Sequence, residues 1–318
     1  MSILRSAAAA GLLAATFLAA ALLATTASAD VAAELAASDV LSGDASQAPA
    51  DLCADECCPL WTIQAGAVIL HRSNPDEGGD LLRLLDTIGV DDFDFGWTAG
   101  LEVAALRRLQ SGNSLELRYL GILDWDADDS RQLGPVTVGG DYSTQLNSTE
   151  LNCRRCAGPH WTWLAGLRII QLHEEFEFGV DAPPLSLSLL ANTDNHLYGG
   201  QFGGQLDWCP FAGPLAISGL VKAGVYGNYA DVQFSQAGIV NISLPRVDDW
   251  NTAFVGELGV VATYPLSDRW SLRGGYQLLY IDGVALATDQ PLFVLTPQLD
   301  ADSSVLYHGA IFGLELAW

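Results

Sequence analysis

The strongest constraint on this chain is a two-residue alternation of side-chain types that runs to its last residue. Within the final thirteen residues, one set of alternate positions holds Leu306, His308, Ala310, Phe312, Leu314, Leu316 and Trp318. The other set holds Tyr307, Gly309, Ile311, Gly313, Glu315 and Ala317. Because successive side chains of a strand point to opposite faces, the pattern predicts a β-strand with two different environments.

The same alternation predicts about ten strands. The clear ones lie at 114–125, 195–208, 252–264, 270–281 and the C-terminus. Weaker ones are expected near 60–72, 93–107, 161–176 and 214–232, and a polar one at 142–152 completes the pairing. Most have at least the 9 to 11 residues that a tilted transmembrane strand needs. We predict an all-β, closed, antiparallel up-and-down transmembrane β-barrel, with eight or twelve strands as alternatives; a soluble β-sandwich fits this many apolar faces less well.

The N-terminus predicts export. Arg5 precedes an apolar run over residues 7–24, and Ala27-Ser28-Ala29 provides the small residues of a cleavage site. We expect residues 1–29 to be a cleaved signal peptide, with a membrane anchor helix as the alternative. Residues 30–59 read as a flexible periplasmic lead-in that contains cysteines, and 60–318 as the outer-membrane barrel.

The composition excludes some partners. The net charge is −24 with a pI of about 4.2, which argues against nucleic acid or anionic lipid surfaces as partners. Hydrophobic residues nevertheless make up 50% of the chain, unlike a disordered acidic protein. Outer-membrane lipid is therefore an expected partner, and the oligomeric state is left open.

The predicted connections alternate between short and long. The short ones are 109–113, 153–159, 209–213 and 265–268, and the long ones are 73–92, 126–141, 177–194, 233–249 and 282–302. Short turns are periplasmic in such barrels, so both barrel ends should face the periplasm. The terminal aromatic strand ending at Trp318 is then the expected contact of the barrel-insertion machinery. The aromatic residues expected to form girdles at strand ends are Trp61, Trp97, Trp125, Trp161, Trp163, Trp208, Trp250, Trp270, Trp318, Tyr264 and Tyr280.

The cysteines all fall on the predicted periplasmic side. They are Cys53, Cys57, Cys58, Cys153, Cys156 and Cys209. Exported proteins meet an oxidising compartment, which favours disulfides over a metal site. The Cys153–Cys156 spacing suits half a zinc site, but no second half follows. We expect disulfides between the lead-in and the second and third short turns, with the pairing open.

Eight charged residues are expected to face the barrel interior. The acids are Glu102, Glu116, Glu257 and Glu315, and the bases are Arg118, Arg168, Lys222 and Arg273. A barrel of about ten strands is little wider than the eight-stranded kind, which side chains fill. Charges in so narrow a space should pair. We predict a plugged or very narrow lumen, with a small selective pore as the alternative.

The long connections are rich in acid but do not form a recognisable metal site. Asp124, Asp126 and Asp128 have the spacing that begins a calcium loop, yet position six is Asp129 and position twelve is Pro135 instead of Gly and Glu. We expect a solvated acidic rim and no cofactor. Weak binding of Ca²⁺ or Mg²⁺ by these four aspartates is the alternative.

Catalytic motifs are missing from the sequence. It holds five histidines and no nucleophile elbow, zinc-protease motif or phosphate loop. We therefore expect no enzyme, although a barrel can assemble a site from several strands.

Several segments resemble one protein family. They are Leu70-His-Arg-Ser-Asn-Pro75, Phe93-Asp-Phe-Gly96, Gly112-Asn-Ser-Leu-Glu-Leu-Arg-Tyr119 with Asp124-Trp125, Ser148-Thr-Glu-Leu-Asn152 and the C-terminal segment. Together they resemble the beta barrel porin-7 family of planctomycete-type bacteria over about 60–318. The resemblance implies an outer-membrane barrel, without catalytic or ligand residues.

Three functions are compatible with these observations. We favour a porin-like outer-membrane barrel that is structural or weakly transporting. The alternatives are a cell-surface binding or adhesion barrel that uses its acidic loops, in a cation-dependent way or not, and an outer-membrane enzyme.

Overall fold

The computed structural model describes residues 59–73, 96–208, 214–238, 241–290 and 299–318, without the side chains of Leu123 and Asp124. The expected signal peptide and nearly all of the lead-in lie outside these residues. The strands are β1 (Trp61–Ser73), β2 (Trp97–Arg108), β3 (Asn113–Leu133), β4 (Val136–Cys156), β5 (Trp161–Ala182), β6 (Leu185–Trp208), β7 (Ala216–Ala237), β8 (Ile242–Ser243), β9 (Val247–Pro265), β10 (Trp270–Val284) and β11 (Ser303–Ala317). No helix within the described ranges is long and apolar enough to cross a membrane.

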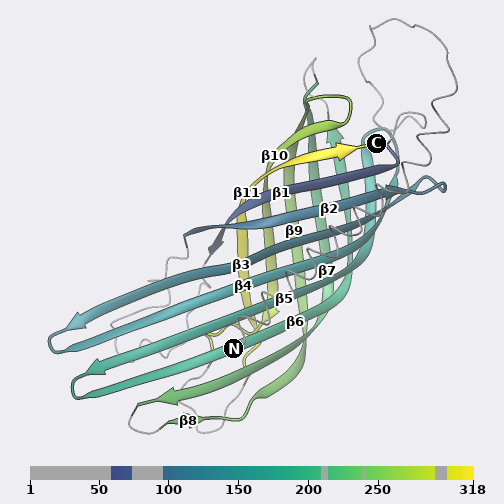
Figure 1. Ribbon diagram of the computed structural model, residues 1–318. Helices are drawn as coiled ribbons and strands as arrows, with labels where there is room; N and C mark the ends of the chain where they lie inside the picture. The colour runs from purple at the N-terminus through teal and green to yellow at the C-terminus, as the bar shows by residue number, and fades with distance from the viewer. Residues whose placement is uncertain (1–58, 74–95, 209–213, 239–240, 291–298) are drawn as a thin grey trace, which may run out of the picture. The chain divides into compact units, whose positions relative to one another are not determined.

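The described strands form one closed antiparallel ring (Figure 1). All except the two-residue β8 pair with a neighbour on each side, in the order β1 to β7, then β9, β10 and β11. The ring closes where β11 pairs with β1, from Thr62 opposite Ala317 to Ser73 opposite Leu306. These ten ring strands confirm the predicted up-and-down barrel, and every expected strand is present.

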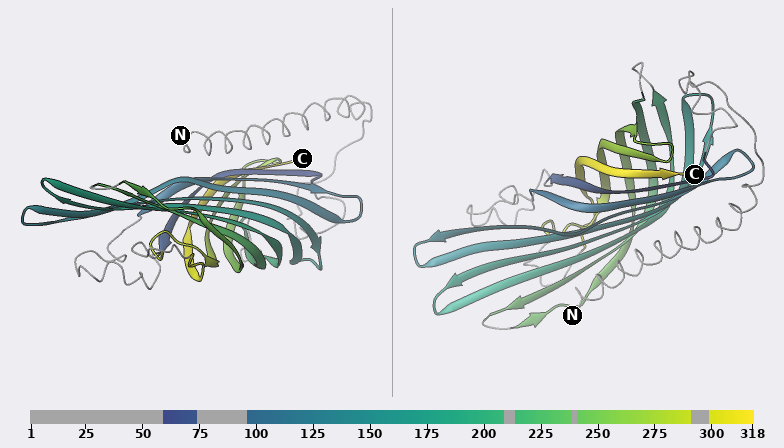
Figure 2. Two further views of the ribbon diagram at one scale, coloured as in Figure 1. Left: turned by 90° about the horizontal axis from the view of Figure 1, so that it is seen from below. Right: turned by 45° about the horizontal axis from the view of Figure 1, so that its top comes forward.

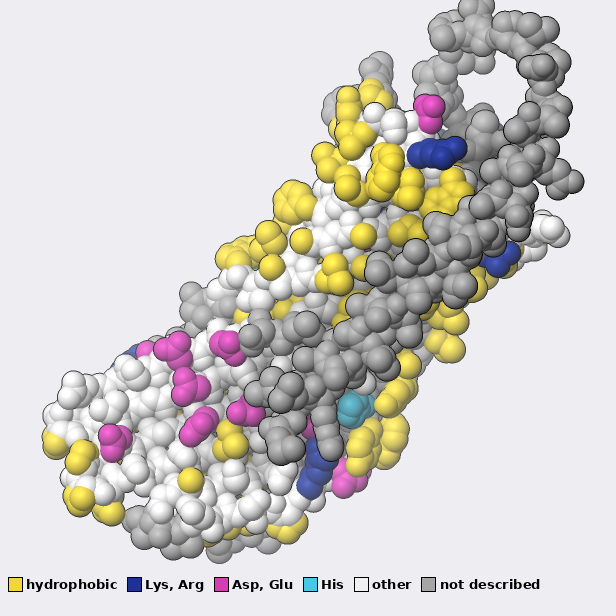
Figure 3. Space-filling model, in the orientation of Figure 1, with side chains coloured by type: hydrophobic (Ala, Val, Ile, Leu, Met, Phe, Trp, Pro, Cys, Tyr) yellow, Lys and Arg dark blue, Asp and Glu magenta, His cyan; other side chains and the backbone are white. Residues whose placement is uncertain are grey.

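A belt of apolar side chains covers the outside of the ring (Figure 3). Its exposed members include Leu101, Leu115, Leu117, Leu151, Trp163, Leu167, Ile169, Phe202, Leu206, Val221, Val225, Leu258, Val260, Leu272, Tyr276, Leu278, Phe312 and Leu314. A surface this apolar is far larger than the patches of soluble proteins. It is the lipid-facing band of a transmembrane barrel, whose strands leave no open edge for the bilayer to meet.

Five neighbouring strands continue well beyond the shorter strands of the ring. The strands β3 to β7 have 21 to 24 residues, whereas β1, β2, β10 and β11 have 12 to 15. Figure 2 shows the hairpins β3–β4 and β5–β6 running past the ends of the shorter strands. At a rise of about 3.3 Å per residue, 24 residues extend roughly 80 Å, about twice what a tilted span needs. We call the part of the barrel beyond the belt the extension.

The extension corrects the predicted loops. Most of 126–141, 177–194 and 233–249 is strand, and β3 and β4 are joined by a tight turn at Gly134 and Pro135. The reason is a change in which face is apolar. Along β5, Leu167 and Ile169 face outward in the belt, whereas further along Glu175 and Glu177 face outward and apolar side chains face inward. The predicted strands, which were based on outward apolar residues, therefore ended too early.

The inner face of the extension carries a hydrophobic core. Its fully buried members include Leu146, Leu172, Phe176, Ala191, Val232, Ile281 and Tyr307. Outside the bilayer such burial is favoured by the hydrophobic effect, as in a soluble protein. The barrel thus has an apolar exterior in the belt and an apolar interior in the extension.

The sequence analysis expected Trp125 in an aromatic girdle, but Trp125 lies in this core. A β-bulge between Ile122 and Trp125 shifts the register of β3 against β4. The extra residue reverses the faces beyond it, which is a usual effect of bulges. Trp125 is consequently 1% exposed and packs on Tyr307 with ring centroids 5.6 Å apart. Other predicted girdle residues, including Trp97, Trp163, Trp208, Trp250 and Trp270, are exposed.

The chain folds back into the barrel after β10. Gly283 has a φ of 78° at a register shift in β10, and a Cβ there would lie 2.5 Å from the carbonyl oxygen of Thr252. Only glycine accepts both the positive φ and the close approach. Residues 284–288 and Gln290 are buried. The expected long loop 282–302 thus includes, at 285–290, a segment packed inside the extension, which we call the inward segment.

Replacement of Trp125 by Ala should lower the free energy of unfolding by about 3 to 5 kcal/mol, because it leaves a large cavity in a packed core. The matched change Trp250→Ala, at a side chain that is 62% exposed, should cost clearly less. Urea titration of the protein in lipid vesicles measures both. Equal losses would contradict an interior position for Trp125.

Candidate functional site

The belt region of the interior contains a dense network of charges. Arg118 on β3 lies at its centre and donates to Glu102 at 2.9 Å, Glu257 at 2.6 Å and Glu150 at 3.1 Å. It also donates to the side-chain oxygen of Gln277 on β10 at 3.1 Å. All four partners are buried. One guanidinium therefore connects five strands, which a planar group with five donors can do without leaving its plane.

Two further bases complete the centre of the network. Lys222 on β7 contacts Glu150 at 2.8 Å and Glu257 at 3.0 Å. Arg168 on β5 donates to Glu257 at 2.8 Å and to the hydroxyl of Ser148 at 2.9 Å. Arg168 also lies 3.7 Å from Glu150, so Glu150 and Glu257 are each shared by three bases. We call Arg118, Arg168, Lys222, Glu150 and Glu257 the central cluster.

Smaller pairs flank the central cluster toward the short-turn end. Glu116 pairs with Arg154 and accepts a hydrogen bond from Asn152 at 2.9 Å. Gln64 links Glu315 and Arg273, at 2.9 and 2.7 Å. Five acids and five bases of the described interior therefore meet in this region: Glu102, Glu116, Glu150, Glu257, Glu315, Arg118, Arg154, Arg168, Lys222 and Arg273.

The structure places all eight charges expected in the interior on the inner face of the ring. The sequence reading missed Glu150 and Arg154, because the strand at 142–152 was recognised only weakly. The two-residue alternation could have identified both residues. Along β4, the side chains that point inward are Ser148, Glu150, Asn152 and Arg154, and they alternate with outward residues. Two more buried charges, Arg72 and Glu174, were also missed.

Arg72 and Glu174 anchor the extension. The Arg72 guanidinium contacts Glu174 at 2.6 Å, and both side chains are fully buried. The Tyr142 hydroxyl donates to the other Glu174 oxygen at 2.5 Å, and the same oxygen accepts the backbone N–H of Ala287 at 3.0 Å. The Asn195 side chain meanwhile exchanges two hydrogen bonds of 2.8 Å with the backbone of Ala285. Buried polar groups thereby hold the inward segment against the barrel wall.

The interior is filled at two levels as a result. Ion pairs occupy the belt region, and the hydrophobic core with the inward segment occupies the extension. Ion pairs in a low-dielectric interior resist rearrangement, because breaking a pair leaves a buried charge without compensation. Chemically, this arrangement is suited to holding opposite walls of a barrel together.

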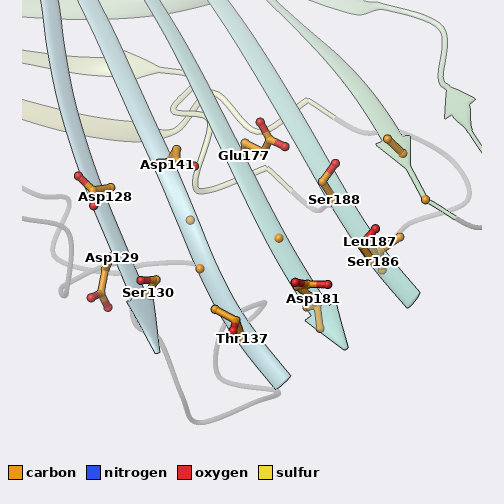
Figure 4. Close-up of a pocket in the computed structure, with 16 residues that line it drawn as sticks. Asp128, Asp129, Ser130, Thr137, Asp141, Glu177, Asp181, Ser186, Leu187 and Ser188 are labelled. Carbon is orange, nitrogen blue, oxygen red and sulfur yellow. The ribbon is translucent and has the colours of Figure 1, made fainter. Parts of the chain in front are cut away.

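The outside of the extension has the opposite character and is acidic (Figures 3 and 4). Asp128 on β3 lies directly opposite Asp141 on β4, which lies directly opposite Glu177 on β5. These three side chains are exposed and border a hollow of about 460 Å³, with Asp181 and Ser188 nearby. Like charges in direct cross-strand contact are destabilising, so this acidic row carries a cost in stability.

The expected weak metal ligands are distributed over both faces of β3. Asp126 and Asp128 are outward and exposed, whereas Asp129 is on the alternate face, and the Asp124 side chain is outside the described set. No group of three or more candidate ligands among the described residues has a geometry that could hold a metal ion. Binding of Ca²⁺ or Mg²⁺ there stays a prediction.

His173 and Asp194 form a pair on the outer face of the extension. Their side chains are 2.6 Å apart, and Arg246 contacts the second Asp194 oxygen at 2.8 Å. The hydrogen bond to Asp194 raises the pKa of His173 above its ordinary value. The protonated pair therefore stabilises the folded state below the ordinary histidine pKa, and this contribution is lost as the pH rises through the raised pKa.

Of the six cysteines, Cys153 and Cys156 are within the described residues, near the short-turn end of β4. They are three positions apart on one strand, too far for a disulfide with each other. Cys156 lies 3.7 Å from the Thr162 hydroxyl. Cys53, Cys57, Cys58 and Cys209 lie outside the described residues, so the disulfides stay a prediction.

Replacement of Arg118 by Ala should lower the free energy of unfolding by about 3 to 5 kcal/mol, because Glu102, Glu150 and Glu257 lose a shared base in a buried site. The matched change Arg131→Ala, at a side chain 46% exposed, should stay within about 0.5 kcal/mol. Urea unfolding in vesicles, followed by tryptophan fluorescence, measures both. A small effect at Arg118 would mean that the cluster is hydrated.

Comparison with known proteins identifies no family. No family model matches the chain, and no curated protein matches it. Among solved structures, the outer membrane protease OmpT from Escherichia coli aligns with a TM-score of 0.46 and 8% identity, over 81% of this chain and 96% of that one. The translocator domain of the autotransporter NalP from Neisseria meningitidis aligns with a TM-score of 0.35 and 10% identity, over 81% and 88%. Neisserial surface protein A aligns with a TM-score of 0.26 and 12% identity, over 81% and 97%.

Proposed function

We propose that this protein is an exported outer-membrane β-barrel whose interior is closed to solutes and whose role is structural: it anchors a rigid acidic extension at the cell surface. The observation that carries the proposal is the double filling of the interior. The closed ring and its apolar belt support a location in a membrane, and bacterial outer membranes are where single-chain barrels of this kind occur.

The central cluster supports closure in the belt region. A conducting pore needs a continuous path of water, and its charged walls are separated by that water. Here the acids and bases contact each other directly, at 2.6 to 3.1 Å, across the ring. The sequence-based resemblance to a porin-like family agrees with the barrel, but the paired charges favour a closed member over a porin.

The extension supports closure at a second level. The inward segment is buried, and its backbone is bonded to Asn195 and Glu174 on neighbouring strands. A solute would have to displace it and also separate the central cluster. The two levels use different residues, so both have to be removed to open the lumen.

Planar-bilayer recording tests closure. The wild-type barrel should insert without producing steady conductance steps. A variant with both levels removed should conduct: Arg118, Lys222, Glu150 and Glu257 replaced together by Ser, which removes two bases and two acids, and residues 285–290 replaced by a Gly-Ser segment of equal length.

Conductance of the variant shows that the protein inserts into the bilayer under these conditions. The absence of conductance from the wild type then reports a closed lumen. Both proteins should show heat-modifiable migration on gels as evidence of a folded barrel. Steady conductance from the wild type would overturn the closed-barrel proposal and restore a selective pore.

A second candidate is a surface-binding barrel, favoured by the acidic row. Asp128, Asp141 and Glu177 are placed side by side despite the repulsion between them, around a hollow on the outer face. A cationic partner at the cell surface would relieve that repulsion, so the destabilising acidic row would favour binding of the partner.

Titration calorimetry with an oligolysine peptide tests the second candidate. The variant Asp128→Asn/Asp141→Asn/Glu177→Gln should lose most of the binding. The matched variant Asp248→Asn/Asp249→Asn/Asp302→Asn, which removes the same charge elsewhere outside the barrel, should lose much less. Equal losses would mean that the peptide responds to net charge alone, without a site at the acidic row.

A further inference from the structure

We propose that the short-turn rim of the barrel binds the phosphate headgroups of anionic phospholipids through three arginines, each of which lies beside an interfacial tryptophan. These rim arginines are Arg107, Arg155 and Arg269, and all three are exposed. The short turns of such barrels are periplasmic, so the lipids concerned are those of the inner leaflet. The inference needs only a membrane-inserted barrel, and holds whether or not the lumen conducts.

Arg107 is near the end of β2 and points outward. Its guanidinium carbon lies 5.3 Å from the centroid of the Trp61 ring on β1, in a cation–π contact. A hollow of about 740 Å³ opens beside it and includes the apolar side chains of Leu60 and Leu109 in its described lining. A hollow lined by two arginines and two leucines at the edge of the belt suits an amphiphile with a phosphate at one end.

Arg155 is near the end of β4 and also points outward. It is the direct cross-strand partner of Trp163 on β5, whose ring is 43% exposed and stacks on Phe202 with centroids 5.3 Å apart. The guanidinium therefore borders an aromatic surface that faces lipid. Among the described residues, no acid is paired with Arg155 by an ion pair.

Arg269 lies in the turn between β9 and β10, directly before Trp270. Its carbonyl oxygen accepts the N–H of Ala317 at 2.9 Å, which fixes the backbone of the turn to β11. The Trp270 ring is 45% exposed on the outside of the barrel. The turn also contains Asp268, the one exposed acid near the rim in the described part of the chain.

The distribution of charge reinforces this assignment. In the belt, the described glutamates all face the interior, where they are paired, so Asp268 is the exposed described acid that could compete for a rim arginine. The exposed acids gather instead on the extension at the other end (Figure 3). The described part of a chain of net charge −24 thus has a basic edge at the short-turn end.

The chemistry of the groups identifies the ligand. Guanidinium binds phosphate through two parallel hydrogen bonds, and it is weakly hydrated compared with an ammonium group. Tryptophan rings prefer the headgroup level of a bilayer, which places each neighbouring arginine at the depth of the lipid phosphates. Anionic lipids attract basic residues near the surface, and that attraction weakens with added salt.

Quenching of tryptophan fluorescence by brominated lipids tests the proposal. The full-length protein is reconstituted into bilayers in which phosphatidylcholine is replaced stepwise by brominated phosphatidylcholine or brominated phosphatidylglycerol. The wild type should bind phosphatidylglycerol several-fold more strongly than phosphatidylcholine. The variant Arg107→Gln/Arg155→Gln/Arg269→Gln should bring the ratio close to one, and the corresponding triple Lys variant should keep part of the preference.

Two controls make the result decisive. Arg131→Gln, a neutralisation at the far end of the barrel, should leave the ratio unchanged, and heat-modifiable migration confirms that each variant is folded. A wild-type ratio of one, or a preference that survives in the triple Gln variant, overturns the proposal. An excess of inorganic phosphate should weaken the preference more than chloride of equal ionic strength does, because free phosphate competes for the same guanidinium groups.

Discussion

The sharing of Glu150 and Glu257 among Arg118, Arg168 and Lys222 is the interaction on which the rest of the interior depends. Backbone hydrogen bonds join each strand only to its neighbours, whereas these ion pairs join β3 to β9, β5 to β9 and β4 to β7 across the ring. Because the charges are buried, each one requires the others to stay in place. The narrow ring brings the bases close enough to share their acids, and the shared acids in turn keep the ring narrow.

The barrel solves two different burial problems along one set of strands. In the belt the solvent outside is lipid, so apolar side chains face outward and the charges are paired inside. In the extension the solvent outside is water, so the same strands turn their apolar side chains inward. On β3, the extra residue in the bulge near Trp125 reverses which face of the strand points inward. The inward segment then completes the core that the extension strands enclose.

Much of this fold was predictable because period-two alternation is a direct property of strands. The ring and the inward faces of Glu102, Glu116, Arg118 and Glu257 followed from the alternation alone, whereas the strand at 142–152 was included only to complete the pairing. The alternation alone does not show where the environment outside the barrel changes from lipid to water, so the extension was predicted as loops. It also cannot anticipate a bulge, which misplaced Trp125, or a chain reversal such as that at Gly283, which carries the inward segment into the barrel. Which charges share a partner depends on positions across the ring and is not encoded locally.

The height of the extension has a consequence for how this sequence can change in length. One residue inserted into the belt part of β4 would turn Glu150 and its inward neighbours toward lipid, so the spanning segments cannot vary by single residues. Near the tip between β3 and β4, by contrast, two residues added to each strand would preserve every face and lengthen the hairpin by one repeat. The reach of the protein above the membrane is therefore a dimension that can grow or shrink in even steps, while the spanning part stays constant.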